Sequence, residues 1–140
     1  MNQGETKEQI LELLDTNKFG TLATVENNKP HTRYMTFLHE DFTLFTPTSK
    51  ETHKAEEIEN NPNVHILLGY HGGEIGKDVF LEVQGKAEIV DDEETKKTMW
   101  HESFGHWFKG PEDPEYVILK ITPVAMRLMN TGEGAQSIEF

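Results

Sequence analysis

Alternating apolar and polar residues, separated by tight turns, dominate the first third of the chain and predict β-strands. Residues 19–26 (FGTLATVE) alternate in this way and are rich in β-branched side chains. Asn27-Asn28 suits a two-residue hairpin turn, because asparagine tolerates positive φ. A return strand over residues 30–39 and a third short strand over 42–46 follow. The region is therefore expected to form an antiparallel meander.

Three longer apolar segments, residues 64–70, 78–90 and 116–130, predict further strands. Gly85 is expected to mark a bulge or bend, and Pro123 a bulge or a sheet edge. The last ten residues are polar and glycine-containing, and are expected to be loosely held.

Helical spacing of apolar residues predicts a helix over residues 6–17, and Pro62 limits a second helix to residues 51–60. Acidic residues 91–94 suit the start of a third helix that runs to about residue 104. Strands dominate, and tight turns rather than helical crossovers join the first three. The expected fold is mainly β: a six-stranded antiparallel barrel with inserted helices, forming a single domain over residues 1–140.

The net charge of −12, from 25 acidic and 13 basic residues, limits the classes of partner that the chain is expected to bind. Such a surface repels nucleic acid and anionic membranes, so neither is expected as a partner. The chain has no cysteine, no signal peptide pattern and no apolar run of membrane-spanning length. We therefore expect a cytoplasmic protein without thiol chemistry.

Hydroxyl groups and a lysine gather at the start of the second helix, where Lys54 lies in the first turn. The hydroxyls belong to Thr46, Thr48, Ser49 and Thr52. Helix N-terminal amides, hydroxyls and a lysine together bind phosphate well. The same residues also fit an ordinary helix cap with a solvated lysine, and local sequence does not separate the two interpretations.

Arg33 lies in the middle of a predicted strand, on the same face as Met35 and Phe37. An arginine among apolar neighbours suggests that this face meets a ligand or partner. The alternative is an arginine at a sheet edge whose head extends into water.

Aromatic residues cluster around the third helix: Trp100, Phe104, Trp107 and Phe108. This cluster fits a core or a subunit interface, and it also fits a wall over a flat aromatic ligand. His101 and His106 are five residues apart, a spacing that does not match the zinc-protease motif, so no metal site is predicted. Serine-hydrolase, P-loop and dinucleotide-binding motifs are absent.

Four segments together resemble the pyridoxamine 5′-phosphate oxidase-like FMN-binding split barrels, and among them the bacterial subgroup called general stress protein 26. They are the strand GTLATVE, the helix motif H-K-A-x-x-I-x-x-N-P, the strand V-x-G-x-A-x-I and the segment GPEDPEYVILKITP. The resemblance covers nearly the whole chain, and its helix motif is the most specific part.

The resemblance implies a homodimer with FMN bound at the subunit interface. It places the strand around Met35 along the flavin ring, and Lys54, with His53 beside it, at the phosphate. The implied cofactor-binding set is Arg33, Tyr34, Met35, Thr36, Phe45, Thr46, Ser49, Thr52, His53, Lys54, Trp107 and Met129.

Several positions depart from the vitamin-phosphate oxidases that the chain resembles. Leu38 replaces a lysine that binds substrate phosphate, while Ala135 and Ser137 replace a substrate-binding R-x-H pair. Met129 replaces a tryptophan, and Glu139 lies near the position of a lost arginine in the tail. Oxidation of pyridoxamine phosphate is therefore not expected.

Two classes of function remain open from the sequence. One is an FMN-dependent oxidoreductase linked to the general stress response, with an unknown substrate and no identified catalytic residue. The other is a flavin-binding or sensor protein without turnover. A split barrel that binds deazaflavin or haem is a further alternative.

Overall fold

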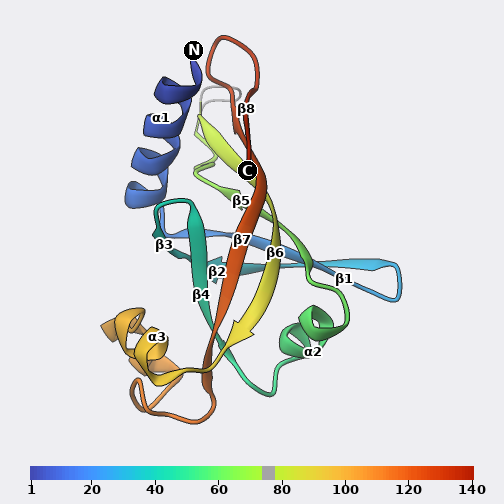
Figure 1. The fold of residues 1–140 in the computed structure, drawn as a ribbon, viewed down its shortest axis with the longest axis vertical. Helices are drawn as coiled ribbons and strands as arrows, with labels where there is room; N and C mark the ends of the chain where they lie inside the picture. Colours follow the sequence, from blue (N-terminus) through green and yellow to red (C-terminus); the bar gives the residue numbers. More distant parts are fainter. Residues whose placement is uncertain (74–77) are drawn as a thin grey trace.

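The computed structural model describes residues 1–73 and 78–140, without the side chains of His53 and Lys54. The described residues form one antiparallel sheet in the order β2-β1-β5-β6-β7-β4-β3, with β8 paired to β7 (Figure 1). The strands are β1 (Phe19–Glu26), β2 (Lys29–Thr36), β3 (Leu38–Glu40), β4 (Thr43–Ser49), β5 (Asn63–Leu68), β6 (Phe80–Val90), β7 (Tyr116–Met129) and β8 (Gln136–Glu139).

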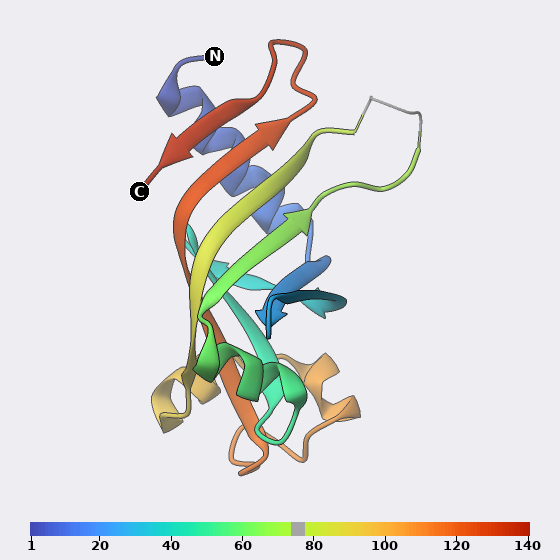
Figure 2. The same ribbon diagram turned by 90° about the vertical axis from the view of Figure 1, so that its right-hand side faces the viewer.

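Helices lie at both ends of the long strands. They are α1 (Gln3–Thr16), α2 (His53–Asn60), α3 (Glu93–Thr98) and the 3₁₀ helix η1 (Glu102–His106). Helix α1 lies beside β8 at one end, while α2, α3 and η1 gather at the other (Figures 1 and 2). None of the described helices combines the length and the apolar character that crossing a membrane requires.

The sheet curls until its two ends approach each other without pairing. The Thr46 hydroxyl, on β4, donates to the Thr36 carbonyl of β2 at 2.7 Å. Within the described ranges, no strand ladder joins β2 to β4 or β3. The barrel is therefore split along the free edge of β2, which confirms the mainly β, split-barrel class expected from the sequence.

Alternation along the strands directs apolar side chains into the barrel. On β5, Val64, Ile66 and Leu68 are buried while the residues between them are exposed. Helix α1 covers this interior with Ile10, Leu13 and Leu14. The spacing of apolar residues predicted from the sequence therefore matches the spacing of buried residues in the structure.

The structure corrects the expected strand count, because the described residues form eight strands rather than six. Residues 30–39 do not form one strand. Phe37 turns into the core, where 2% of its surface remains exposed, and this separates β2 from β3. The tail is also not loosely held, since Ile138 is buried and β8 pairs with β7.

The expected third helix is interrupted, with α3 ending at Thr98 and η1 starting at Glu102. The predicted bulge is confirmed, because the register between β6 and β7 shifts at Gly85, opposite Pro123. The proline's missing N–H is tolerated at such an irregularity, even though β7 lies inside the sheet.

Candidate functional site

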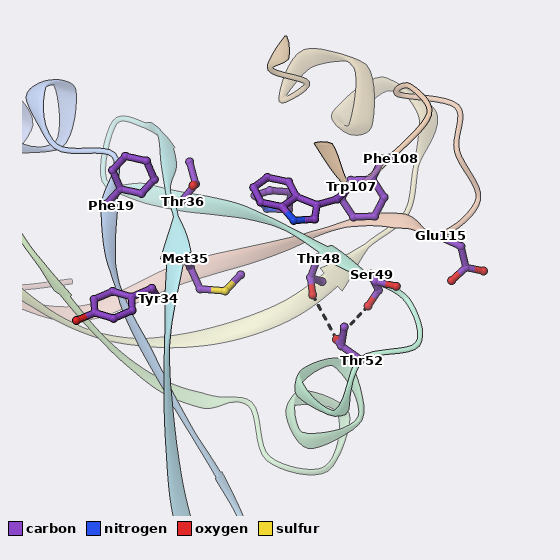
Figure 3. A pocket seen from close by; sticks show the side chains of 11 residues that line it. Phe19, Tyr34, Met35, Thr36, Thr48, Ser49, Thr52, Trp107, Phe108 and Glu115 are labelled. Carbon is purple, nitrogen blue, oxygen red and sulfur yellow. Dashed lines mark hydrogen bonds between the residues drawn. The ribbon is translucent and has the colours of Figure 1, made fainter. Parts of the chain in front are cut away.

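A pocket of about 660 Å³ lies along the free edge of β2, at the split of the barrel (Figure 3). Its two ends differ in chemistry, one being aromatic and the other rich in hydroxyls. Eleven of the described residues line it: Phe19, Tyr34, Met35, Thr36, Pro47, Thr48, Ser49, Thr52, Trp107, Phe108 and Glu115.

The aromatic end consists of large aromatic side chains that are exposed to solvent. Tyr34 is 85% exposed, Phe19 75% and Trp107 67%. Trp107 and Phe108 follow η1, while Tyr34 and Phe19 come from the paired strands β2 and β1 (Figure 3). Three large exposed aromatic side chains around one pocket indicate a surface that a ligand or another chain covers.

The polar end lies where β4 leads into α2. Thr52 caps the helix, accepting a hydrogen bond from the Ala55 amide at 3.4 Å. Its hydroxyl donates to the Ser49 carbonyl at 3.0 Å and lies 3.3 Å from the Thr48 hydroxyl (Figure 3). Hydroxyls therefore surround a helix N-terminus, where amide dipoles favour an anion.

The charge at this end differs from what an anion site needs. Among the described lining side chains, Glu115 is the one charged group, and it is negative. The cation that the sequence offers is Lys54, whose side chain, like that of His53, lies outside the described part. The positive potential of the described site therefore comes from the backbone of α2.

A small polar network holds the loop that carries Trp107 and Phe108. The Asp113 carboxylate accepts hydrogen bonds from the amides of Lys109 (2.9 Å) and Glu115 (3.0 Å). These bonds, the Lys109 one foremost, hold the pKa of Asp113 below its ordinary value. The Tyr116 hydroxyl donates to the Lys96 carbonyl at 2.9 Å, and burial raises the pKa of Tyr116 to about 12.

Replacing Tyr116 by phenylalanine tests this anchoring. The ring would still pack against Phe104 and Phe108, but the Lys96 carbonyl would lose its buried donor. We expect a loss of about 1 kcal/mol in the free energy of unfolding, the usual net value of one hydrogen bond. Urea unfolding followed by tryptophan fluorescence measures it, and unchanged stability would show that the hydroxyl does not anchor α3 to β7.

Among the described residues of the predicted flavin-binding set, six line the pocket: Tyr34, Met35, Thr36, Ser49, Thr52 and Trp107. Phe45 and Thr46 lie on β4 but are buried, and Met129 is at the far end of β7, opposite Phe80.

Sequence reasoning did not single out Phe19, Pro47 or Glu115 as lining residues. It considered Thr48 only as one of the hydroxyls before the second helix, and Phe108 only as a member of the aromatic cluster. Pro47 lies between Thr46 and Thr48 on β4, so including every residue of that stretch would have found it. Phe19 and Glu115 carry no local signal of this kind.

Arg33 does not line the pocket, although its neighbours on β2 do. Its guanidinium donates to the Thr24 hydroxyl at 2.7 Å and to Glu57 Oε2 at 3.1 Å. The Thr24 hydroxyl in turn donates to the same carboxylate oxygen. Thr24 and Glu57 are both buried, so the strand face that carries Arg33 meets helix α2 at this point.

This arrangement lowers the pKa of Glu57 below its ordinary value of 4.5. The hydrogen bond from Thr24 is the largest cause, desolvation opposes it, and Arg33 and the nearby His31 assist. A lowered folded-state pKa stabilises the fold above the unfolded value, and this contribution is lost as the pH falls through the folded value.

Glu57→Gln is therefore expected to cost stability at neutral pH and progressively less as the pH falls below 4.5. Urea denaturation of both proteins between neutral and acidic pH measures this difference. A difference that stays constant over the whole range would contradict the charged role of Glu57.

The split barrel, its edge pocket and its helix N-terminus agree with one family. The chain belongs to the pyridoxamine 5′-phosphate oxidase family, whose sequence profile matches residues 6–130. It is 56% identical over 133 residues to General stress protein 26 of Bacillus subtilis (strain 168), covering 95% of this chain and 94% of that protein. The family and subgroup resemblance found in the sequence is therefore confirmed.

Solved structures agree with this placement. The crystal structure of General Stress Protein 26 from Bacillus anthracis str. Sterne superposes with a TM-score of 0.86 at 37% identity, over 97% of this chain and 99% of that one. A heme binding protein from Mycobacterium smegmatis shares the fold, with a TM-score of 0.81 at 13% identity over 99% of this chain and 60% of that one. The second likeness concerns the fold alone.

Proposed function

We propose that the pocket beside β2 binds FMN. The observation that carries this proposal is that an exposed aromatic wall leads directly to a hydroxyl-ringed helix N-terminus. A flavin has a flat apolar ring system at one end and a phosphate at the other. The two ends of the pocket match these two groups.

The residues present fit such a ligand in size and chemistry. A volume of about 660 Å³ lies within the usual range for cofactor sites. Strand β2 near Met35 and the side chain of Trp107 would contact the ring. Thr48, Ser49 and Thr52 would contact the phosphate end, together with Lys54 as the family resemblance implies.

Bound FMN would supply the redox chemistry, while the chain binds it, orients it and limits its contact with water. The aromatic residues provide a surface for the ring, and the amides at the start of α2 oppose the phosphate charge. Glu115, at the polar end, would repel the phosphate, so the α2 amides, the hydroxyls and Lys54 must outweigh it.

We further propose that a second copy of the chain completes the site, as expected from the family resemblance. The exposed side chains of Tyr34, Phe19 and Trp107 support this, because one flat ligand would not cover them all. Light scattering on the purified protein tests the proposal. A mass near two chains would support it, and the mass of a single chain would contradict it.

The proposed activity is that of a flavin-dependent oxidoreductase with an unknown substrate, and flavin binding without turnover is the second candidate. The second is favoured by the replaced substrate positions, because Leu38 packs against the aromatic core and offers no cation. Steady-state oxidation of NADH or NADPH with an added acceptor separates them. Measurable turnover would support the oxidoreductase, and none would support the binding protein.

An absorbance spectrum from 300 to 600 nm, taken before and after addition of FMN and removal of the excess, tests the cofactor proposal. Flavin bands that stay with the protein would support FMN. A Soret band would favour haem instead. No retained chromophore after incubation with FMN would contradict the assignment of the pocket.

A further inference from the structure

Arg33 points away from the pocket that its strand lines. Residues alternate along β2, so Arg33 shares a face with Met35, which lines the pocket. Its guanidinium nevertheless contacts Thr24 on β1 and Glu57 on α2. One side chain thus ties the β1–β2 hairpin to a helix that follows 24 residues later in the sequence.

The contact with Glu57 is a strong constraint on the helix. Only 3% of Glu57 is exposed, and a buried carboxylate is tolerated when charged and polar partners satisfy it. The Arg33 guanidinium, whose side chain is 25% exposed, and the Thr24 hydroxyl are those partners. Among the described hydrogen-bond partners, removing the arginine would leave this buried charge with the Thr24 hydroxyl.

Helix α2 depends on such contacts for its position. It has eight residues, and a helix of this length is not stable without tertiary packing. Ala55 and Ile58 supply an apolar contact with the barrel, since 4% and 3% of their surfaces are exposed. Glu57 supplies the charged contact that fixes the rotation of the helix on that surface.

The same helix presents its first turn to the pocket. Thr52, its cap, is a lining residue, and Glu57 follows it by five positions. At about 1.5 Å of rise per residue, the Arg33–Glu57 pair lies one to two turns behind Thr52. A shift of the pair would therefore move Thr52 and the first turn of the helix.

We propose that Arg33 is a positioning residue, which places the phosphate-binding turn of α2 by binding Glu57 instead of contacting the ligand. The proposal rests on the proposed function, since it names how the FMN site is held. It differs from the direct contact that the family resemblance implies for Arg33.

A mutant cycle distinguishes positioning from contact. Arg33→Met removes the guanidinium that pairs with Glu57, whereas the double variant Arg33→Met/Glu57→Gln removes the buried charge as well. We expect Arg33→Met to weaken FMN binding at least about tenfold while riboflavin, which lacks the phosphate, changes less than about twofold. Because Arg33 acts through Glu57, the double variant is expected to bind FMN as Glu57→Gln alone does, and more tightly than Arg33→Met, which keeps a buried charge without its cation. A double variant that binds FMN as weakly as Arg33→Met would overturn the proposal.

Hydrogen exchange of the α2 amides in flavin-free protein gives an independent reading. Arg33→Met should accelerate exchange in α2 at least about tenfold, and the double variant should restore protection. Unchanged exchange in Arg33→Met would overturn the proposal. Wild-type protein that retains neither flavin would contradict the FMN assignment instead, and the exchange result would still decide whether Arg33 holds the helix.

Glu57→Gln alone keeps the test valid if Arg33→Met does not fold. A freed Arg33 that binds phosphate directly would strengthen FMN binding in this variant. Positioning predicts the opposite sign, namely weaker FMN binding with riboflavin affinity retained. Stronger FMN binding by Glu57→Gln would therefore reject the positioning role.

Discussion

Replacing Lys54 by alanine is expected to weaken FMN binding about 10- to 150-fold, equivalent to about 1.5–3 kcal/mol, the range for hydrogen bonds to charged groups. The reason is that Lys54 belongs to the first turn of α2, where the hydroxyls and amides of the polar end converge. The described lining offers no other cation to oppose the phosphate. Fluorescence titration of flavin-free protein with FMN measures the change.

Lys50→Ala is the matched control, because it removes the same charge from a nearby position. The Lys50 ammonium pairs with Asp91 at 3.2 Å, and Lys50 does not line the pocket. FMN affinity should change less than about twofold in this variant, as expected for a screened surface charge. Equal losses in both variants would show a general charge effect and remove Lys54 from the phosphate site.

Gly20→Ala is expected to destabilise the fold by about 1–3 kcal/mol, the usual cost of overpacking. A Cβ at Gly20 would collide with the backbone carbonyl of Leu67 and would lie 2.6 Å from Leu68 Cδ2. Gly20 is paired with β2 on one side and β5 on the other, so neither neighbour can withdraw without breaking a ladder. Chemical denaturation of both proteins measures the loss.

Gly105→Ala provides the comparison, because a Cβ there meets no atom within 4 Å. Its free energy of unfolding should stay within about 0.5 kcal/mol of the wild type, as for surface substitutions in general. A Gly20→Ala protein as stable as Gly105→Ala would mean that β1 and β5 do not approach as closely as the structure shows.

Local patterns predicted the parts of the fold that local chemistry controls. The Asn27-Asn28 turn adopts positive φ at both residues, 51° and 61°, as the hairpin interpretation required. The bulge at Gly85 was also predicted, because glycine has a specific backbone use there. In both cases the residue type itself constrains the backbone.

Long-range packing determined the parts that the sequence did not reveal. Strand β8 carries one buried apolar residue, Ile138, and its pairing with β7 depends on the position of a distant strand. The partner of Arg33 is Glu57, 24 residues away on another element. Alternation placed Arg33 on the correct face of β2, but it could not identify what lay opposite.

The candidate site shows the same division. The hydroxyl-bearing residues before α2 were visible as composition next to a helix start, and Thr48, Ser49 and Thr52 do line the pocket. Phe19 and Glu115 enter it because the barrel is split between β2 and β4, which no local pattern specifies. The Arg33–Glu57 ion pair likewise depends on how β2 and α2 pack together, which no local pattern specifies.

Parallel titrations of the flavin-free wild-type protein with FMN and with riboflavin test the central claim most directly. The claim is that the aromatic wall holds the ring and the start of α2 holds the phosphate. It predicts saturable FMN binding that is at least about tenfold tighter than riboflavin binding, the value of one charge-assisted contact or more. Equal affinities for the two flavins, or no binding of either, would contradict it.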